Sequence, residues 1–166
     1  MTLRHSITLL ALTPLCAQAS YTTFGQGCGA TWGEPPTRAQ MVLSGVPRIG
    51  QSVQVSVVGP HFTSRGYSRV NMLVTGMSRT SYAGLNLPHL FPWWVTGGGG
   101  TDCYALCSIE AFEFLSPAFR QIAIPANPSL IGLKLYQQWY LNYILRGPTV
   151  HVFYITSDAA EMTIGL

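Results

Sequence analysis

The sequence predicts an all-β protein: an antiparallel β-sandwich of jelly-roll or immunoglobulin-like type, with one disulfide bond and a cleaved signal peptide. Short runs of alternating apolar and polar residues recur along the chain, and 17 Gly and 11 Pro are spread between them. No segment has the apolar period and the caps of an amphipathic helix. Strands that recur roughly every 10–15 residues, with turns between them, are typical of sandwiches and jelly rolls.

The chain opens with the three parts of a secretory signal. Arg4 and His5 form a short basic start, residues 7–15 are mostly apolar, and Ala17-Gln18-Ala19 is a small-x-small cleavage site. The apolar run is too short to span about 30 Å of hydrocarbon. We therefore expect residues 1–19 to be a cleaved signal peptide and residues 20–166 to form a single domain that is secreted or held at the cell surface.

Two other interpretations of this start are less favoured. A buried N-terminal helix or strand would also be apolar. A lipid anchor at Cys16 would need a small residue just before the cysteine, and Leu15 occupies that position.

Within the domain, alternation predicts each strand in turn. In 52–57, three valines alternate with polar residues, which is typical of a half-buried strand. The segment 133–144 is the longest, and it places Trp139, Leu141 and Tyr143 on one face. The predicted strands, in chain order, are 52–57, 70–75, 119–124, 133–144, 150–156 and 161–166.

Charge is scarce in this chain. Lys and Arg number 9 and Asp and Glu number 6, which is 9% of the residues; an ordinary globular domain has about 25%. With 48% hydrophobic residues, a lone copy cannot carry an ordinary ionic surface. Either neutral polar residues solvate the exterior, or much of it is buried against other subunits.

The same composition argues against two classes of partner. The formal net charge of +3 is too small and too scattered for a nucleic-acid-binding stripe. No segment after the signal approaches the roughly 18 uninterrupted apolar residues of a membrane helix. We therefore expect no nucleic acid as partner and no insertion into a membrane.

The predicted mature chain keeps three cysteines, Cys28, Cys103 and Cys107. In an oxidising compartment an odd number predicts one bridge and one leftover thiol, or a bond between chains. If 104–109 is a strand, Cys103 and Cys107 lie about 13 Å apart by rise, too far to pair with each other. Cys28 would then pair with one of the two. The lack of a CxxC pair disfavours a metal site built from the three thiols.

Four blocks of the sequence resemble an uncharacterised β-sandwich module found in exported bacterial proteins, often as their C-terminal domain. The module has a Gly-Cys start, a G-x-P-x-x-G turn, an IPN-x-x-L-x-G block and a TIG end. The matching blocks here are Phe24-Gly25-Gln26-Gly27-Cys28, Gly45-Val46-Pro47-Arg48-Ile49-Gly50, Ile124-Pro125-Ala126-Asn127-Pro128-Ser129-Leu130-Ile131-Gly132 running on to Tyr136-Gln137-Gln138-Trp139, and Ser157 with Met162-Thr163-Ile164-Gly165.

The resemblance implies a secreted β-domain with a disulfide between Cys28 and Cys103. Cys107 begins a Cys-Ser-Ile-Glu stretch where the module has a VSPD-like one, so its thiol has no counterpart and would be either free or intermolecular. The resemblance brings no catalytic residues.

The residues themselves show no recognisable catalytic or metal-binding motif. Glu110 and Glu113 are the closest pair of acids, and His61, His89 and His151 lie in three separate segments without ligand spacing. There is no G-x-S-x-G motif. The glycines at 97–100 are followed by neither Lys-Ser/Thr nor a helix pattern, which favours a flexible loop over a phosphate site. We therefore expect no enzyme activity, no metal and no cofactor.

These features favour a structural protein that assembles with copies of itself into an extracellular filament, sheath or surface layer. The segment Val150 to Ile155 is apolar on both faces and has no charged guard, so it is either central in a sheet or covered by another chain. Val150, Val152 and Tyr154 are its candidate contact residues. The segment from Tyr21 to Phe24, just after the cleavage site, is a candidate donor strand.

The alternative is an adhesion module that binds a surface glycan or a protein. Trp93 and Trp94 are adjacent, so an extended backbone would point them to opposite faces and leave one to form a stacking platform.

Overall fold

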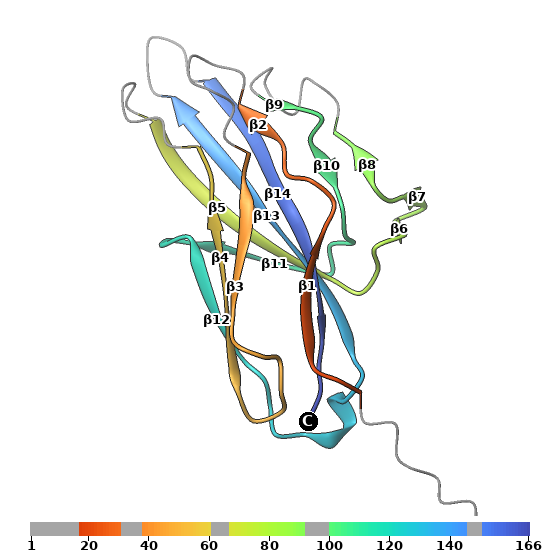
Figure 1. Ribbon diagram of the computed structural model, residues 1–166. Coiled ribbons are helices and arrows are strands. Elements are labelled where there is room, and N and C mark those ends of the chain that lie inside the picture. Colours follow the sequence, from red (N-terminus) through yellow and green to blue (C-terminus); the bar gives the residue numbers. More distant parts are fainter. Residues whose placement is uncertain (1–16, 31–37, 61–66, 92–99, 146–150) are drawn as a thin grey trace, which may run out of the picture.

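The computed structural model describes residues 17–30, 38–60, 67–91, 100–145 and 151–166 (Figure 1). It is an antiparallel β-sandwich, as the sequence predicts, and its helical content in the described residues is a single 3-10 turn, Pro128–Leu130. No helix in these ranges has the length and hydropathy that a membrane span requires.

The larger sheet has five strands in the order β1-β14-β13-β5-β11. All of its pairings are antiparallel. Its strands are β1 (Ser20–Phe24), β5 (Tyr67–Gly76), β11 (Ala111–Leu115), β13 (Lys134–Leu145) and β14 (His151–Thr163).

The smaller sheet has three strands in the order β12-β4-β3. They are β3 (Gln40–Ser44), β4 (Ser52–Val58) and β12 (Phe119–Ala123). The chain passes from the larger sheet to the smaller one through the short connection between β11 and β12 (Figure 1).

Three two-stranded ladders complete the described structure. They pair β2 (Gly29–Ala30) with β9 (Gly100–Thr101), β6 (Ser81–Tyr82) with β7 (Leu85–Asn86), and β8 (His89–Leu90) with β10 (Tyr104–Ala105).

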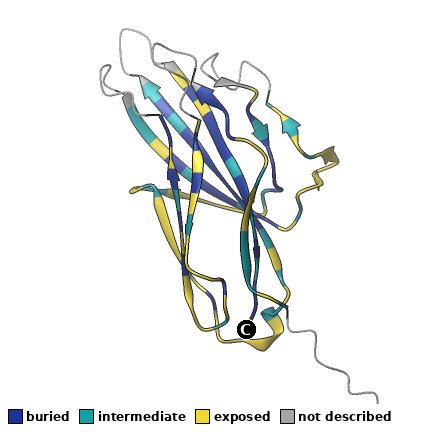
Figure 2. Ribbon diagram, viewed as in Figure 1, coloured by how far each residue is buried: buried dark blue, intermediate teal, exposed yellow. Residues whose placement is uncertain are grey.

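The core lies between the two sheets because alternate residues of each strand point inward. The smaller sheet contributes Val55 and Val57 of β4, and the larger contributes Trp139, Leu141 and Phe153, all of them buried. Figure 2 shows the buried positions concentrated in β13 and β14, whereas β11 and β12 are largely exposed. The predicted inward face of 133–144 is confirmed.

The disulfide implied by the resemblance is present: Cys28 and Cys103 are bonded, with their Cα atoms 4.8 Å apart. Cys28 also joins the end of the N-terminal segment to β14, because its backbone N–H donates to the carbonyl of Thr156 at 2.8 Å. The bridge therefore fixes the chain directly after β1.

Two predicted boundaries are wrong. Residues 150–156 and 161–166 were expected as separate strands, but β14 runs without a break from His151 to Thr163. The polar residues between them are used inside the sheet: Ser157 Oγ accepts from the N–H of Trp139 at 3.0 Å, and the Asp158 carboxylate accepts from the N–H of Met41 at 2.6 Å.

The second wrong boundary is the conditional strand 104–109. It is limited to Tyr104–Ala105, and the buried residues after it form a loop. Gln138 holds this loop: its Oε1 accepts from the N–H of Leu106 and its Nε2 donates to the carbonyl of Tyr104, both at 2.9 Å. The Gln138 side chain thus makes the hydrogen bonds to this backbone that a neighbouring strand would make if the strand were longer.

Candidate functional site

The outward side of the five-stranded sheet carries a group of exposed apolar side chains, which we call the outer apolar face. Its members are Val70 of β5, Phe112 and Phe114 of β11, and Val152 and Tyr154 of β14. Phe112 and Phe114 are the most exposed, at 59% and 63%, and their rings make an edge contact with centroids 5.8 Å apart. None of the five is charged.

Strand register brings these residues together from distant parts of the sequence. Phe114 lies opposite Met72, and Val70 lies opposite Asn142, which in turn lies opposite Tyr154. Ile144 lies opposite Val152 in the next row. Since residues two apart on a strand share a face, all of these side chains lie on the side away from the core.

Part of the same sheet side is covered. Phe91 packs edge-on against Tyr140, with ring centroids 5.7 Å apart, and Cys107 and Ile109 pack in the same cluster with Val74. The side chains of this cluster do not cover Val70, Val152 and Tyr154, which are exposed. The outer apolar face is therefore the uncovered remainder of this side.

The other edge of the sheet is formed by β1, which pairs with β14 from Ser20↔Thr163 to Phe24↔Ala159. Tyr21 points inward and packs against both apolar clusters between the sheets. Its hydroxyl donates to Oε1 of buried Gln137, and burial raises the pKa of Tyr21 above its ordinary value.

The last residue of β1 makes two further contacts, on the opposite side of the strand. The Phe24 ring meets Tyr136 edge-on, with centroids 6.2 Å apart, and the Arg79 guanidinium lies 5.8 Å from the Phe24 ring centroid. Tyr21 and Phe24, predicted as donor-strand residues, thus serve as the two side-chain anchors of β1.

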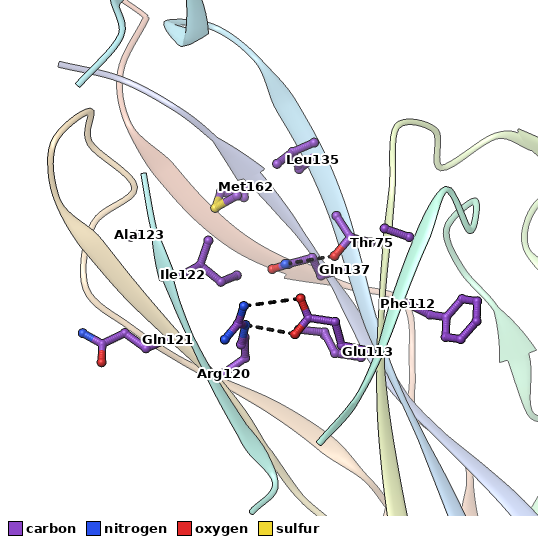
Figure 3. A pocket seen from close by; sticks show the side chains of 12 residues that line it. Thr75, Phe112, Glu113, Arg120, Gln121, Ile122, Ala123, Leu135, Gln137 and Met162 are labelled. Atoms are coloured by element: carbon purple, nitrogen blue, oxygen red, sulfur yellow. Dashed lines mark hydrogen bonds and ion pairs between the residues drawn. The ribbon is translucent and has the colours of Figure 1, made fainter. Parts of the chain in front are cut away.

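A cavity of about 490 Å³ lies between the sheets beside β11 and β12. Figure 3 shows Arg120 and Glu113 facing each other across it, with Arg120 Nε 3.0 Å from the Glu113 carboxylate. Thr75 and Gln137 add polar groups, and Gln137 Nε2 donates to Thr75 Oγ1 at 3.3 Å. The Phe112 ring points away from the cavity, toward the outer apolar face (Figure 3).

The acids that the sequence places closest, Glu110 and Glu113, have separate hydrogen-bond and ion-pair partners. Glu113 faces the cavity and is paired with Arg120. The Glu110 carboxylate instead accepts from the N–H of Met77 at 2.8 Å and from Ser108 Oγ at 2.7 Å. Both carboxylates are therefore engaged, and Glu110 serves to close a turn.

In the part of the chain that the structure describes, no three His, Cys, Asp or Glu residues gather as a metal site. His89 is half-buried. His61 lies outside the described residues, as do Trp93, Trp94 and Val150 among the predicted contact residues, so the stacking platform stays a prediction.

Cys107 has a free and buried thiol. Burial, with a smaller contribution from the charge of Glu110, raises its pKa to about 12. A buried thiol that keeps its proton is a poor partner for a bond to another chain, which favours the free over the intermolecular alternative.

Phe112 and Phe114, the most exposed members of the outer apolar face, are not among the residues predicted from the sequence. A signal for them is present: in Ala-Phe-Glu-Phe-Leu the two rings are two residues apart and share one face of an extended strand.

Comparisons with protein families, with curated proteins and with solved structures found no match for this chain.

Proposed function

We propose that this chain is a non-catalytic structural protein, exported from the cell, whose copies assemble with one another into an extracellular filament, sheath or surface layer. The observation that carries the proposal is the outer apolar face, with Phe112 and Phe114 exposed on a strand at the edge of the sheet.

The size of the face supports an interface. The exposed parts of the Phe112, Phe114 and Tyr154 rings come to about 300 Å², taking about 200 Å² for each whole side chain. The largest apolar patch on a typical monomer is about 300–600 Å² and is often functional, so this face lies at the lower end of that range. A stable interface takes about 800 Å² from each partner, so a neighbour would also have to engage an adjoining strand.

The chemistry of the face favours a second copy as its occupant. The face has no charged member that would select an acidic or a basic partner, and two such faces meet without like-charge repulsion. It also ends at β11, whose outer edge is unpaired among the described strands and can be continued by a strand of another chain. The scarcity of charge in the whole chain points the same way.

The test is to remove the two rings at the edge and to measure assembly. We would concentrate the chain from Ser20 onward, measure the fraction that pellets, and examine the pellet by electron microscopy. The variant Phe112→Ser/Phe114→Ser is expected to lose the pelleted fraction and the ordered particles. Both side chains are already exposed, so the fold should tolerate the change.

Phe119→Ser is the matched control. Phe119 is 45% exposed, but it belongs to β12 in the other sheet. Assembly should persist in this variant. If the Phe112/Phe114 variant pelleted as fully as the unchanged chain, the outer apolar face would not be the interface and the proposal would lose its support.

One observation favours a second candidate, an adhesion module that binds a glycan. The cavity beside β11 and β12 brings Thr75, Gln137, Arg120 and Glu113 together, and such polar groups can bond sugar hydroxyls. No ring stacks there, since Phe112 points away (Figure 3). Glycan-array binding that is abolished by Arg120→Met, and kept by Phe112→Ser/Phe114→Ser, would favour this candidate.

A further inference from the structure

We propose that β1 is exchanged between copies, so that Ser20–Phe24 of one copy pairs with Ala159–Thr163 of the next. This inference rests on the proposed function and deepens it, because it names the segment that is passed on and the edge that receives it. Each copy would give one strand and receive one, and head-to-tail repetition of this step links copies in an open chain when the rotation between neighbours does not close.

β1 is attached to the domain by a single ladder among the described strands. It is the first described strand, it lies at the edge of the five-stranded sheet, and β14 is its one ladder partner among the described strands (Figure 1). The strand is five residues long, and Thr22 and Thr23 on it are exposed. Its release breaks one ladder and leaves every other described pairing in place.

The edge of β14 fits the side chains of this particular segment. Tyr21 fills space between the two apolar clusters and satisfies the buried amide oxygen of Gln137. Phe24 packs on Tyr136, on the side of the sheet opposite to Tyr21. An edge without β1 would therefore lose a core side chain and a hydrogen bond, and the same segment of a second copy restores both.

The connection that follows β1 contains the residues at which the backbone would turn. Gly25 is exposed and has a positive φ of 69°, which is a conformation that glycine adopts without strain. Two residues later the chain is fixed, because a Cβ on Gly27 would lie 2.0 Å from the carbonyl oxygen of Ala39 and Cys28 is bridged to Cys103.

A turn at Gly25 and Gln26 would leave the domain behind it intact, but it would give up two local contacts. A Cβ on Gly25 would lie 2.6 Å from Leu106 Cδ1, so the backbone here lies against that side chain, and Gln26 Oε1 accepts from the Arg38 guanidinium at 2.6 Å.

Exchange replaces each β1–β14 contact by an identical one, so the contacts alone favour neither arrangement. The relative stability of the two arrangements is set by the contacts that form only between copies that have exchanged β1. Neighbours held by a shared strand can bury the outer apolar face, and this burial favours the linked form. Strand exchange also adds contact between copies at the opposite edge of the sheet, away from β11.

The experiment traps β1 against β14 by a new disulfide. Thr22 lies directly opposite Glu161 in the register, so we would make Thr22→Cys/Glu161→Cys in a Cys107→Ala background. Assembled material would be oxidised and run on a denaturing gel without reductant. We expect a ladder of covalently linked chains.

Lys134→Cys/Thr163→Cys is the matched control. This pair also lies directly opposite, but it joins β13 to β14, and β1 takes no part in it. It should give internally bridged single chains from the same assembled material. A second pair, Ser20→Cys/Thr163→Cys, reports on β1 and β14 again if the first variant fails to fold.

Three results would overturn the inference, and they differ in what else they overturn. Assembled material in which the β1–β14 pairs give only single chains would contradict strand exchange and leave self-assembly standing. Complete absence of assembled material from the unchanged chain would contradict both. A chain whose β1 is bridged to its own β14 before assembly should lose the ability to assemble, and persistence of assembly would contradict the exchange.

Discussion

The hydroxyl of Tyr21 donates a hydrogen bond to Oε1 of Gln137, 116 residues further along the chain. Gln137 is buried, and its Nε2 donates to Thr75 Oγ1 at 3.3 Å. The three side chains connect β1, β13 and β5 beneath the smaller sheet. The phenol is therefore what fastens the first strand to the middle of the larger sheet.

Tyr21→Phe is expected to lower the free energy of unfolding by about 1–2 kcal/mol, because the buried amide oxygen of Gln137 loses its donor while the ring is kept. Urea unfolding followed by tryptophan fluorescence measures the change. Thr22→Val is the matched control, since it removes one hydroxyl from an exposed position of the same strand. Equal effects in the two variants would contradict the role given to the Tyr21 hydroxyl.

Removing the disulfide should have the largest effect on stability. The Cys28–Cys103 bridge spans 75 residues. A closed loop of that length stabilises by about 4 kcal/mol in the chain-entropy account. Cys28→Ala/Cys103→Ala should shift the urea midpoint accordingly, with Cys107→Ala as the control for loss of a thiol. An unchanged midpoint would mean that the bridge does not restrain the unfolded chain.

Alkaline pH should destabilise the fold through Cys107. The folded chain holds this proton up to a pKa of about 12, whereas the unfolded thiol loses it at its ordinary value of 9.0. The stability that this group contributes is thus fully present below pH 9 and is lost as the pH rises toward 12. Between pH 8 and pH 10 we expect a loss of about 1 kcal/mol.

Urea midpoints of the unchanged chain and of Cys107→Ala, each measured at pH 8 and pH 10, separate this contribution from that of the buried tyrosines. Burial also raises the pKa of Tyr21, Tyr140 and Tyr143, and these rings remain in both chains. The charge of Cys107 adds a smaller rise at Tyr140, which belongs to the contribution of the thiol. The fall in stability should be smaller in Cys107→Ala. A fall of the same size in both chains would contradict the assignment to the thiol.

The β14 end of the outer apolar face can be tested apart from its β11 end. Val152→Thr/Tyr154→Thr places β-branched residues, which favour strands, at both positions and removes apolar surface. We expect a weaker assembly, seen as a higher concentration at the onset of light scattering, with the urea midpoint nearly unchanged. An unchanged onset would restrict the interface to the neighbourhood of Phe112 and Phe114.

Alternation predicted the parts of the fold whose strands have one buried and one solvated side. The valines of β4 and the aromatic residues of β13 follow a period of two because one side of each strand packs in the core. The pattern failed where polar side chains replace ladder bonds. Ser157 and Asp158 look like a turn in the sequence, yet both accept backbone N–H groups within the sandwich.

The outer apolar face could be predicted only in part. Val152 and Tyr154 were found because their strand is apolar on both sides. Phe112 and Phe114 join them through pairings that no local pattern encodes, since β11 adds to the far edge of the sheet beside β5. Strand order is set by packing across the whole domain, and it decides which apolar residues end up together.

Sedimentation velocity of the chain from Ser20 onward, over a wide range of protein concentration, tests self-assembly most directly. We predict species that grow with concentration beyond the mass of one chain and that disappear in Phe112→Ser/Phe114→Ser. One boundary at the mass of a single chain, at every concentration, would contradict the account.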